Sequence, residues 1–179
     1  EPQSADIQLK KYIGGKSEVA SVEAAEGLKD SQTEAEAYKA SAEGEDLTVA
    51  FVVKNTGKVA LKDIATPSDA AITAAFTNAL DSTVSGVDGS TPQVGNIRVA
   101  GFAGNAEKQA LLKPGEKVVF VGDLKAPAAG SLHADKAKSA GTPVDDEGRE
   151  VPFVDKDGRE QPEGTSVESN EDQAHAITP

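Results

Sequence analysis

The stretch DLTVAFVVKNTG at residues 46–57 is the strongest β-strand signal in the chain. Strands favour its Val, Thr and Phe residues, and its end, Asn55-Thr56-Gly57, consists of typical turn formers. The next residues, KVALKDI, have strand character again. We therefore predict a strand, a tight turn at 55–57 and a second strand that pairs with the first as a hairpin.

Four further stretches have strand character. EKVVFVGDLKA at 116–126 and the opening DIQLKKYI at 6–13 are rich in branched apolar residues. SLHADKAKSAG at 131–141 is weaker because its apolar residues are small, and GNIRVAGF at 95–102 interrupts a long loop over 81–105. Strands separated by turns, with little helix between them, predict an all-β sandwich.

Two stretches favour short helical insertions. SQTEAEAYKASAEGE at 31–45 is rich in Ala and Glu, with Ser31 or Asp30 as its cap and Glu34 placed as in a capping box. SDAAITAAFTNAL at 68–80 is a second candidate, although its Thr and Ile residues also suit a strand.

Composition excludes several classes of protein. The 179 residues include five Phe, two Tyr and no Trp, so the core must consist of Val, Ile, Leu and Ala. A formal net charge of −12 argues against nucleic acid and anionic membranes as partners. The absence of Cys excludes disulfides and thiolate chemistry, and no run approaches the roughly 18 apolar residues that would insert in a membrane. The opening EPQSA, without Met, is the pattern expected after an excised leader.

The character of the chain changes after Gly141. Residues 142–179 are acidic and contain four Pro residues, so we predict a sandwich core over 1–141, with insertions at 17–44 and 70–110. The remainder, 142–179, is expected to form an acidic hairpin or extended tail that packs on the same domain. Within it, PVDDEGREVP at 143–152 and FVDKDGREQP at 153–162 echo each other as two successive hairpin tips would.

The acidic turns of these two copies are weak Ca²⁺ candidates. Asp145, Asp146, Asp155 and Asp157 alternate near a Gly, as at the start of a Ca²⁺ loop, but the remaining ligands and a closing Glu are missing. A polar hairpin tip is the favoured interpretation, and no other cofactor is expected. The chain also lacks the common catalytic motifs, and its two His residues stand apart in the sequence, so a turnover enzyme is not expected.

The opening strand places a lysine on its apolar face. With a period of two, Ile7, Leu9 and Ile13 point one way, and Lys11 lies between the last two. A lysine is seldom fully buried without a partner. Lys11 is therefore either a residue that extends to water or an amine that the fold places inside.

An inward lysine has a specific chemistry. Burial favours the neutral, nucleophilic amine and the neutral, electrophilic carboxyl, so the two can condense once to an amide between side chains. The partner is expected on a strand adjacent to the first, and Asp135 faces inward if Ala137 does. The acid that transfers protons is Asp69, Asp63 or Glu45; the alternative is that Asp135 lies on a solvated face.

Five stretches follow one another in an order that resembles a known family: DIQLKKYI, GEDLTVAFVVKNTGKVALKDI, LKPGEKVVFVGDL, HADKAKSAGTPVDDEG and ESNEDQAHA. They resemble the DUF11-like repeat of Gram-positive, especially actinobacterial, surface proteins, whose NTG and PGE motifs are specific only in combination. The resemblance covers most of the chain outside the two insertions. It implies an immunoglobulin-like β-sandwich.

The resemblance also implies a place and a role. Such repeats are stalk modules between a wall anchor and a distal adhesive domain, which implies an extracellular, cell-wall-attached protein. Its partners would be neighbouring repeats and a host protein or glycan. The related collagen-adhesin B-type and pilin domains join a first-strand Lys to an Asn or Asp of the last strand by an isopeptide bond. Lys11 matches that lysine, and Asp135 stands where the repeat has Asn, so water would leave in place of ammonia.

We therefore expect a structural stalk or adhesin repeat, locked by a Lys11–Asp135 isopeptide bond that forms in a single turnover. Two alternatives stay open. One is a ligand-binding adhesin domain that uses the 70–110 insertion, since long loops on a rigid sandwich often carry recognition. The other is a repeat that becomes rigid when it binds Ca²⁺.

Overall fold

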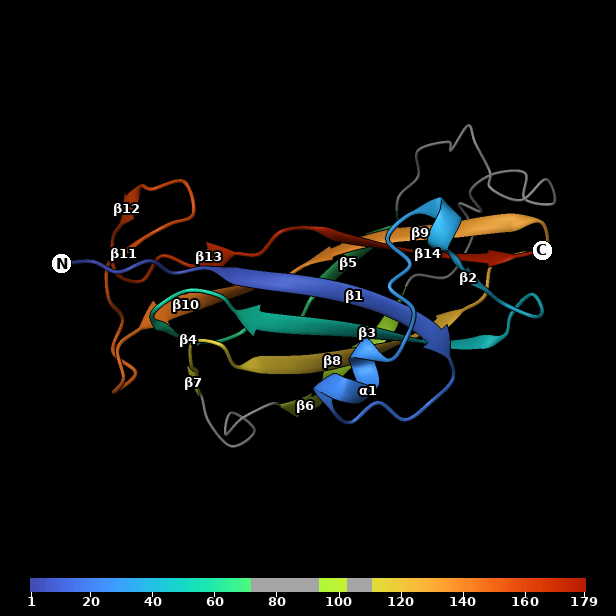
Figure 1. Cartoon of the computed structure of the whole chain (residues 1–179), viewed down its shortest axis with the longest axis horizontal. Coiled ribbons are helices and arrows are strands. Elements are labelled where there is room, and N and C mark those ends of the chain that lie inside the picture. The colour runs from blue at the N-terminus through green and yellow to red at the C-terminus, as the bar shows by residue number, and fades with distance from the viewer. Residues whose placement is uncertain (72–93, 103–110) are drawn as a thin grey trace.

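The computed structural model describes residues 1–71, 94–102 and 111–179. It is almost entirely β, with several antiparallel sheets, which confirms the predicted all-β sandwich. Figure 1 shows the strands running mostly along the length of the molecule, with the N-terminus and the C-terminus at opposite ends of its long axis.

The first sheet holds the strongest sequence signals. Its order is β1 (Ile7–Gly15), β3 (Asp46–Asn55), β8 (Lys117–Lys125) and β6 (Gly95–Phe102), and every neighbouring pair is antiparallel. The central strands β3 and β8 are buried on both faces, which explains why their sequences are nearly continuous apolar runs instead of alternating ones.

The facing layer consists of two shorter sheets. One has the order β2 (Tyr38–Lys39), β14 (Asp172–Thr178), β9 (Ser131–Lys138) and β5 (Ser68–Ala71). The other has the order β13 (Val167–Glu168), β10 (Ala140–Val144), β4 (Ala60–Lys62) and β7 (Leu111–Leu112). A separate ribbon pairs β11 (Phe153–Val154) with β12 (Glu160–Gln161).

Two apolar clusters lie on the two faces of the first sheet. The main core joins side chains of the first sheet, such as Leu9 and Phe51, to Ala174 of β14 and Leu61 of β4. A smaller cluster lies on the outer face of the first sheet, where the short helix α1 (Val22–Glu26) covers it with Ala25. The sequence analysis did not predict α1, whose capping signal is Ser21: its Oγ accepts a hydrogen bond from the Ala24 backbone N–H at 3.0 Å.

The predicted hairpin at 55–57 is wrong, because β3 and β4 belong to different sheets. The backbone N–H groups of Thr56 and Lys58 donate to the carbonyl oxygens of Asp6 and Ser4, so the chain follows the N-terminal segment across the sandwich. Gly57 permits this approach, since a Cβ there would lie 2.5 Å from the Asp6 nitrogen.

The helix predicted at 31–45 is also wrong. That segment contains one 3₁₀ turn, η1 (Glu34–Glu36), followed by β2, which pairs in parallel with Ala176 and Ile177 of β14. Ser31 is fully buried and is not a helix cap. Pairing with β14 outweighs the helical propensity of Ala and Glu.

The second predicted helix, at 68–80, begins in what is a strand. Ser68–Ala71 is β5, which pairs antiparallel with β9 and completes the edge of its sheet. The rest of that prediction, and most of the 70–110 insertion, lies outside the described residues.

The acidic segment 142–179 belongs to the sheets. The boundary expected at 141 falls within β10, and β14 lies between β2 and β9 as an inner strand. The two echoing copies form the same turn: Asp145 N–H donates to the Arg149 carbonyl and Asp155 N–H to the Arg159 carbonyl, with Gly148 and Gly158 at positive φ.

Candidate functional site

Lys11 lies inside the sandwich. The alternation of β1 turns its side chain toward the core with those of Leu9 and Ile13, and it is 0% exposed. Its backbone is paired in register with Phe51 of β3, and its Nζ lies 5.5 Å from the centre of the Phe51 ring. The inward orientation expected from the period-two pattern is therefore confirmed.

Asp135 meets Lys11 across the core. It lies near the middle of β9, is 0% exposed, and its Oδ1 is in contact with the Lys11 Nζ. The expectation that the partner lies on a strand adjacent to the first is wrong in one respect. β9 belongs to the facing sheet, so the pair spans the space between the layers.

His133 is a further polar side chain at this site. It precedes Asp135 by two residues on β9 and therefore faces the same side of the sheet. Its Nε2 lies 2.8 Å from the Asp135 Oδ2, and the residue is 2% exposed. The sequence analysis treated His133 as isolated, although its spacing from Asp135 was a usable signal.

The charges of this group set the protonation of Asp135. Burial opposes ionisation of the carboxyl, but the Lys11 ammonium and the His133 hydrogen bond outweigh it and hold the pKa of Asp135 below its usual value. An ionised carboxylate only accepts hydrogen bonds, so His133 Nε2 carries the hydrogen and donates it to Oδ2. Lys11 and Asp135 then form an oppositely charged pair that is shielded from water.

Two side chains from the C-terminal segment hold the backbone of β1 beside this group. Lys11 N–H donates to the Asp172 Oδ2 at 2.8 Å, and Asp172 is 7% exposed. Asn170 accepts from the Leu9 N–H at 2.9 Å through Oδ1 and donates to the Leu9 carbonyl at 3.0 Å through Nδ2. Together with a backbone bridge between Ile13 and Lys29, they cover the outer edge of β1.

The sequence analysis missed this role of ESNEDQAHA, which it used only for the family resemblance. The signal was an Asn and an Asp two residues apart, which places both on one face of an extended chain.

The three acids expected to transfer protons fall in different places. Asp63 is exposed, in the bend after β4, and Glu45 accepts hydrogen bonds from Ser41 just before β3 begins. The structure therefore brings neither to Lys11 and Asp135. Asp69 lies on β5, and its backbone is paired with Ala137, two residues from Asp135.

The Ca²⁺ candidates do not converge. Oδ1 of Asp145 accepts from the N–H groups of Glu147 and Arg149, and Oδ1 of Asp155 accepts from those of Asp157 and Arg159. Their Oδ2 atoms accept from Arg149 and Gln161 side chains.

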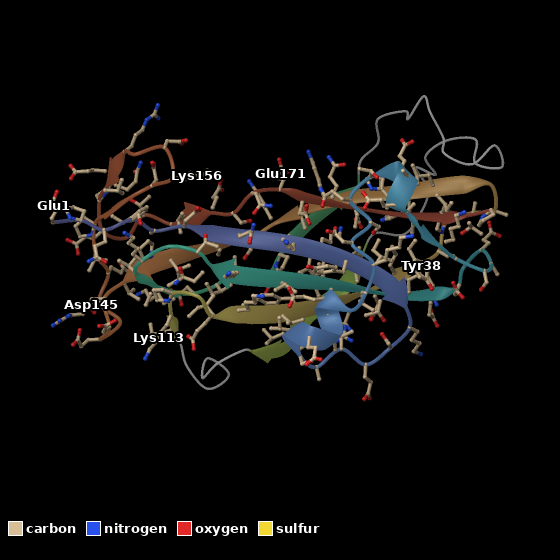
Figure 2. All side chains as sticks on the ribbon, viewed as in Figure 1. Glu1, Tyr38, Lys113, Asp145, Lys156 and Glu171 are labelled. Carbon is tan, nitrogen blue, oxygen red and sulfur yellow. The ribbon has the colours of Figure 1, made fainter. Side chains whose placement is uncertain are left out.

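Asp146 and Asp157 are exposed, and Figure 2 shows Asp145 and Lys156, which mark the two turns, toward the end of the molecule where Glu1 lies. The described part of the chain contains no group of three or more acidic or His side chains able to hold a metal ion. These carboxylates shape hairpin tips.

Within the described ranges, no helix is both long and apolar enough to cross a bilayer. Comparisons with family models, with curated proteins and with solved structures found no match. The site is therefore interpreted from its own geometry.

Proposed function

We propose that this chain is a structural module of a secreted, wall-anchored bacterial surface protein, and that an amide between Lys11 and Asp135 locks it. The observation that carries the proposal is the contact between Lys11 Nζ and the Asp135 carboxylate with both side chains at 0% exposure. A buried ion pair contributes little net stability compared with apolar side chains of similar size, so its presence needs a further reason.

The condensation balances without a cofactor. Lys11 Nζ carries three hydrogens as an ammonium, and Asp135 carries two oxygens as a carboxylate. The Nζ–Cγ bond forms, one Cγ–O bond breaks, and the departing oxygen leaves with two of the three hydrogens as water. The product is a neutral amide in an apolar core, which removes the cost of burying two charges.

The position of the bond suits a load-bearing module. It would tie β1 to β9 and close a loop on the order of 100 residues, which in the chain-entropy treatment of crosslinks stabilises the fold by about 4.7 kcal/mol. A chain without Cys has no disulfide for this purpose. An amide also resists reduction.

Burial argues against a turnover enzyme at this site. Neither Lys11 nor Asp135 is exposed, so a diffusing substrate could not reach them. A reaction between the two side chains needs no access from solvent and happens once in each molecule.

The surface location rests on the resemblance of the NTG, PGE and closing ESNEDQAHA stretches to wall-attached repeats. Neighbouring repeats and a host protein or glycan are the partners that this resemblance implies. The β-sandwich is compatible with that assignment.

Intact-mass spectrometry tests the bond. The wild-type chain is expected to weigh one water less than its sequence, and a proteolytic digest should contain a branched peptide that joins Lys11 to Asp135. Lys11→Met should restore the full mass. Lys10→Met is the matched control, because Lys10 is the exposed neighbour on the other face of β1, and it should keep the loss of water. A wild-type mass equal to the sequence mass would refute the proposal.

A further inference from the structure

His133 has no role in the condensation as described so far, yet it touches one of the reacting atoms. Its imidazole is buried and donates to the Asp135 Oδ2 at 2.8 Å, while Lys11 Nζ contacts the other oxygen, Oδ1. The two oxygens of one carboxylate are thus held by two different groups, a nucleophile on one side and a proton donor on the other.

Amide formation requires a group that stabilises negative charge on one oxygen of the Asp135 carboxyl. When Nζ attacks Cγ, negative charge develops on the oxygen that is to become the amide carbonyl, and a water-excluded core offers no solvent to stabilise it. A positioned proton donor at that oxygen typically accelerates such a step by about 10²–10⁴-fold. Of the three acids considered from sequence, Asp63 and Glu45 lie away from the pair.

We propose that His133 is a catalytic residue for the Lys11–Asp135 condensation, the proton donor to Oδ2. The inference rests on the proposed function, because it assigns a role within that reaction. His133 donates its Nε2 proton to Oδ2 as the tetrahedral carbon forms and takes it back as the carbon collapses to the amide.

Every proton moved in this reaction has a donor and an acceptor among the three side chains. The Lys11 ammonium gives one proton to Oδ1, which leaves a neutral amine beside a neutral carboxyl. Nζ then bonds to Cγ while Oδ2 takes the His133 proton. The attached nitrogen passes a second proton to Oδ1, the Cγ–Oδ1 bond breaks, and water leaves. Oδ2 returns its proton to His133 and remains as the amide oxygen, so the imidazole ends unchanged.

Asp172 is a second carboxylate in contact with Lys11, but it has a different position. Its Oδ2 accepts the backbone N–H of Lys11, so it holds β1 in place and does not act at the Asp135 carboxylate through that contact. Asp172 is a positioning residue in this scheme.

Replacement of His133 tests the assignment. Gln in place of His133 can donate a hydrogen bond to Oδ2 but cannot give up a proton, whereas Glu can do so in its acid form. In the full chain, His133→Gln is expected to be isolated at the full sequence mass and to lose water at least roughly 100-fold more slowly than wild type on incubation. His133→Glu should lose water faster than His133→Gln.

Folding is checked separately, in a Lys11→Met background that cannot form the bond. Thermal melting there shows whether His133→Gln folds, and His133→Asn provides a second amide of smaller size if it does not. Two results would overturn the assignment: loss of water in a folded His133→Gln or His133→Asn variant as complete and as fast as in wild type, or a block in Asp172→Asn without one in His133→Gln. If wild type itself keeps its full mass, the proposed function fails before this step is reached.

Discussion

Lys11 loses the hydration of its ammonium when β1 packs, and the Asp135 carboxylate and the face of the Phe51 ring are among the groups that compensate for this loss. Asp135 is compensated twice, by Lys11 on Oδ1 and by His133 on Oδ2. Removing Lys11 leaves the Asp135 carboxylate its hydrogen bond from His133, whereas removing Asp135 takes away the carboxylate that balances the buried ammonium.

We expect Asp135→Ala to be less stable than Lys11→Met by roughly 1–3 kcal/mol in free energy of unfolding. Neither variant can form the amide, so the difference reports the buried ammonium that has lost its balancing carboxylate. Urea denaturation at neutral pH measures it, with Lys10→Met as the control for loss of a surface lysine. Equal stability of the two variants would contradict the asymmetry.

Strand β14 has buried side chains on both faces of its sheet. Ala174 and Ala176 face the main core, while His175 points to the opposite side and meets the segment that leads to η1. The His175 Nδ1 lies 2.9 Å from the Ser31 carbonyl oxygen, which only accepts, so Nδ1 carries the hydrogen. Burial lowers the pKa of His175, and the hydrogen bond to Ser31 opposes this only in part.

The lowered pKa predicts acid sensitivity of this contact. An unfolded chain takes up a proton on His175 near the ordinary value of 6.5, whereas the folded chain does so only at lower pH. The contribution to stability is therefore present above pH 6.5 and is lost as the pH falls through the lowered folded-state pKa. The urea midpoint of the wild type should fall as the pH falls through that window. His175→Asn should reduce this fall, and Gln173→Asn, which changes an exposed residue of the same strand, should not. Parallel pH profiles of wild type and His175→Asn would show that this histidine is not the sensor.

The direction of load matters for this molecule because the two termini lie at opposite ends of its long axis (Figure 1). The proposed bond joins β1 to β9. In the domains that the sequence resembles, the bond joins the first strand to the last, whereas here β10 to β14 follow β9. The part of the chain between Lys11 and Asp135 would be shielded from tension, while β10 to β14 would stay extensible.

Single-molecule stretching from the two ends tests that geometry. With about 3.5 Å per extended residue, the crosslinked chain should reach roughly 190 Å, because only the segments before Lys11 and after Asp135 can unravel. Lys11→Met should extend to roughly 620 Å. An equal contour length for both proteins would mean that no covalent bond lies between the ends.

The local sequence pattern predicted the structure correctly where local preference and tertiary packing favour the same conformation. The all-β class, the strands at 46–57 and 116–126 and the inward side of Lys11 were predictable, because β-branched runs and a period of two express burial directly. The hairpin at 55–57 and the helix at 31–45 were not. Their outcomes depend on the approach of Gly57 to Asp6 and on pairing of β2 with β14, segments that are distant in the sequence.

The same division applies to the candidate site. From the sequence by itself, Lys11 and Asp135 could be assigned to inward faces of two strands, because each assignment needs only the alternation of its own strand. The contact of Asp135 with both Lys11 and His133, and the attachment of β1 by Asn170 and Asp172, were decided only by tertiary structure. The reason is physical: sequence periodicity fixes which side of a strand a residue faces, but the residue that it meets there depends on how two separate sheets stack and in what register.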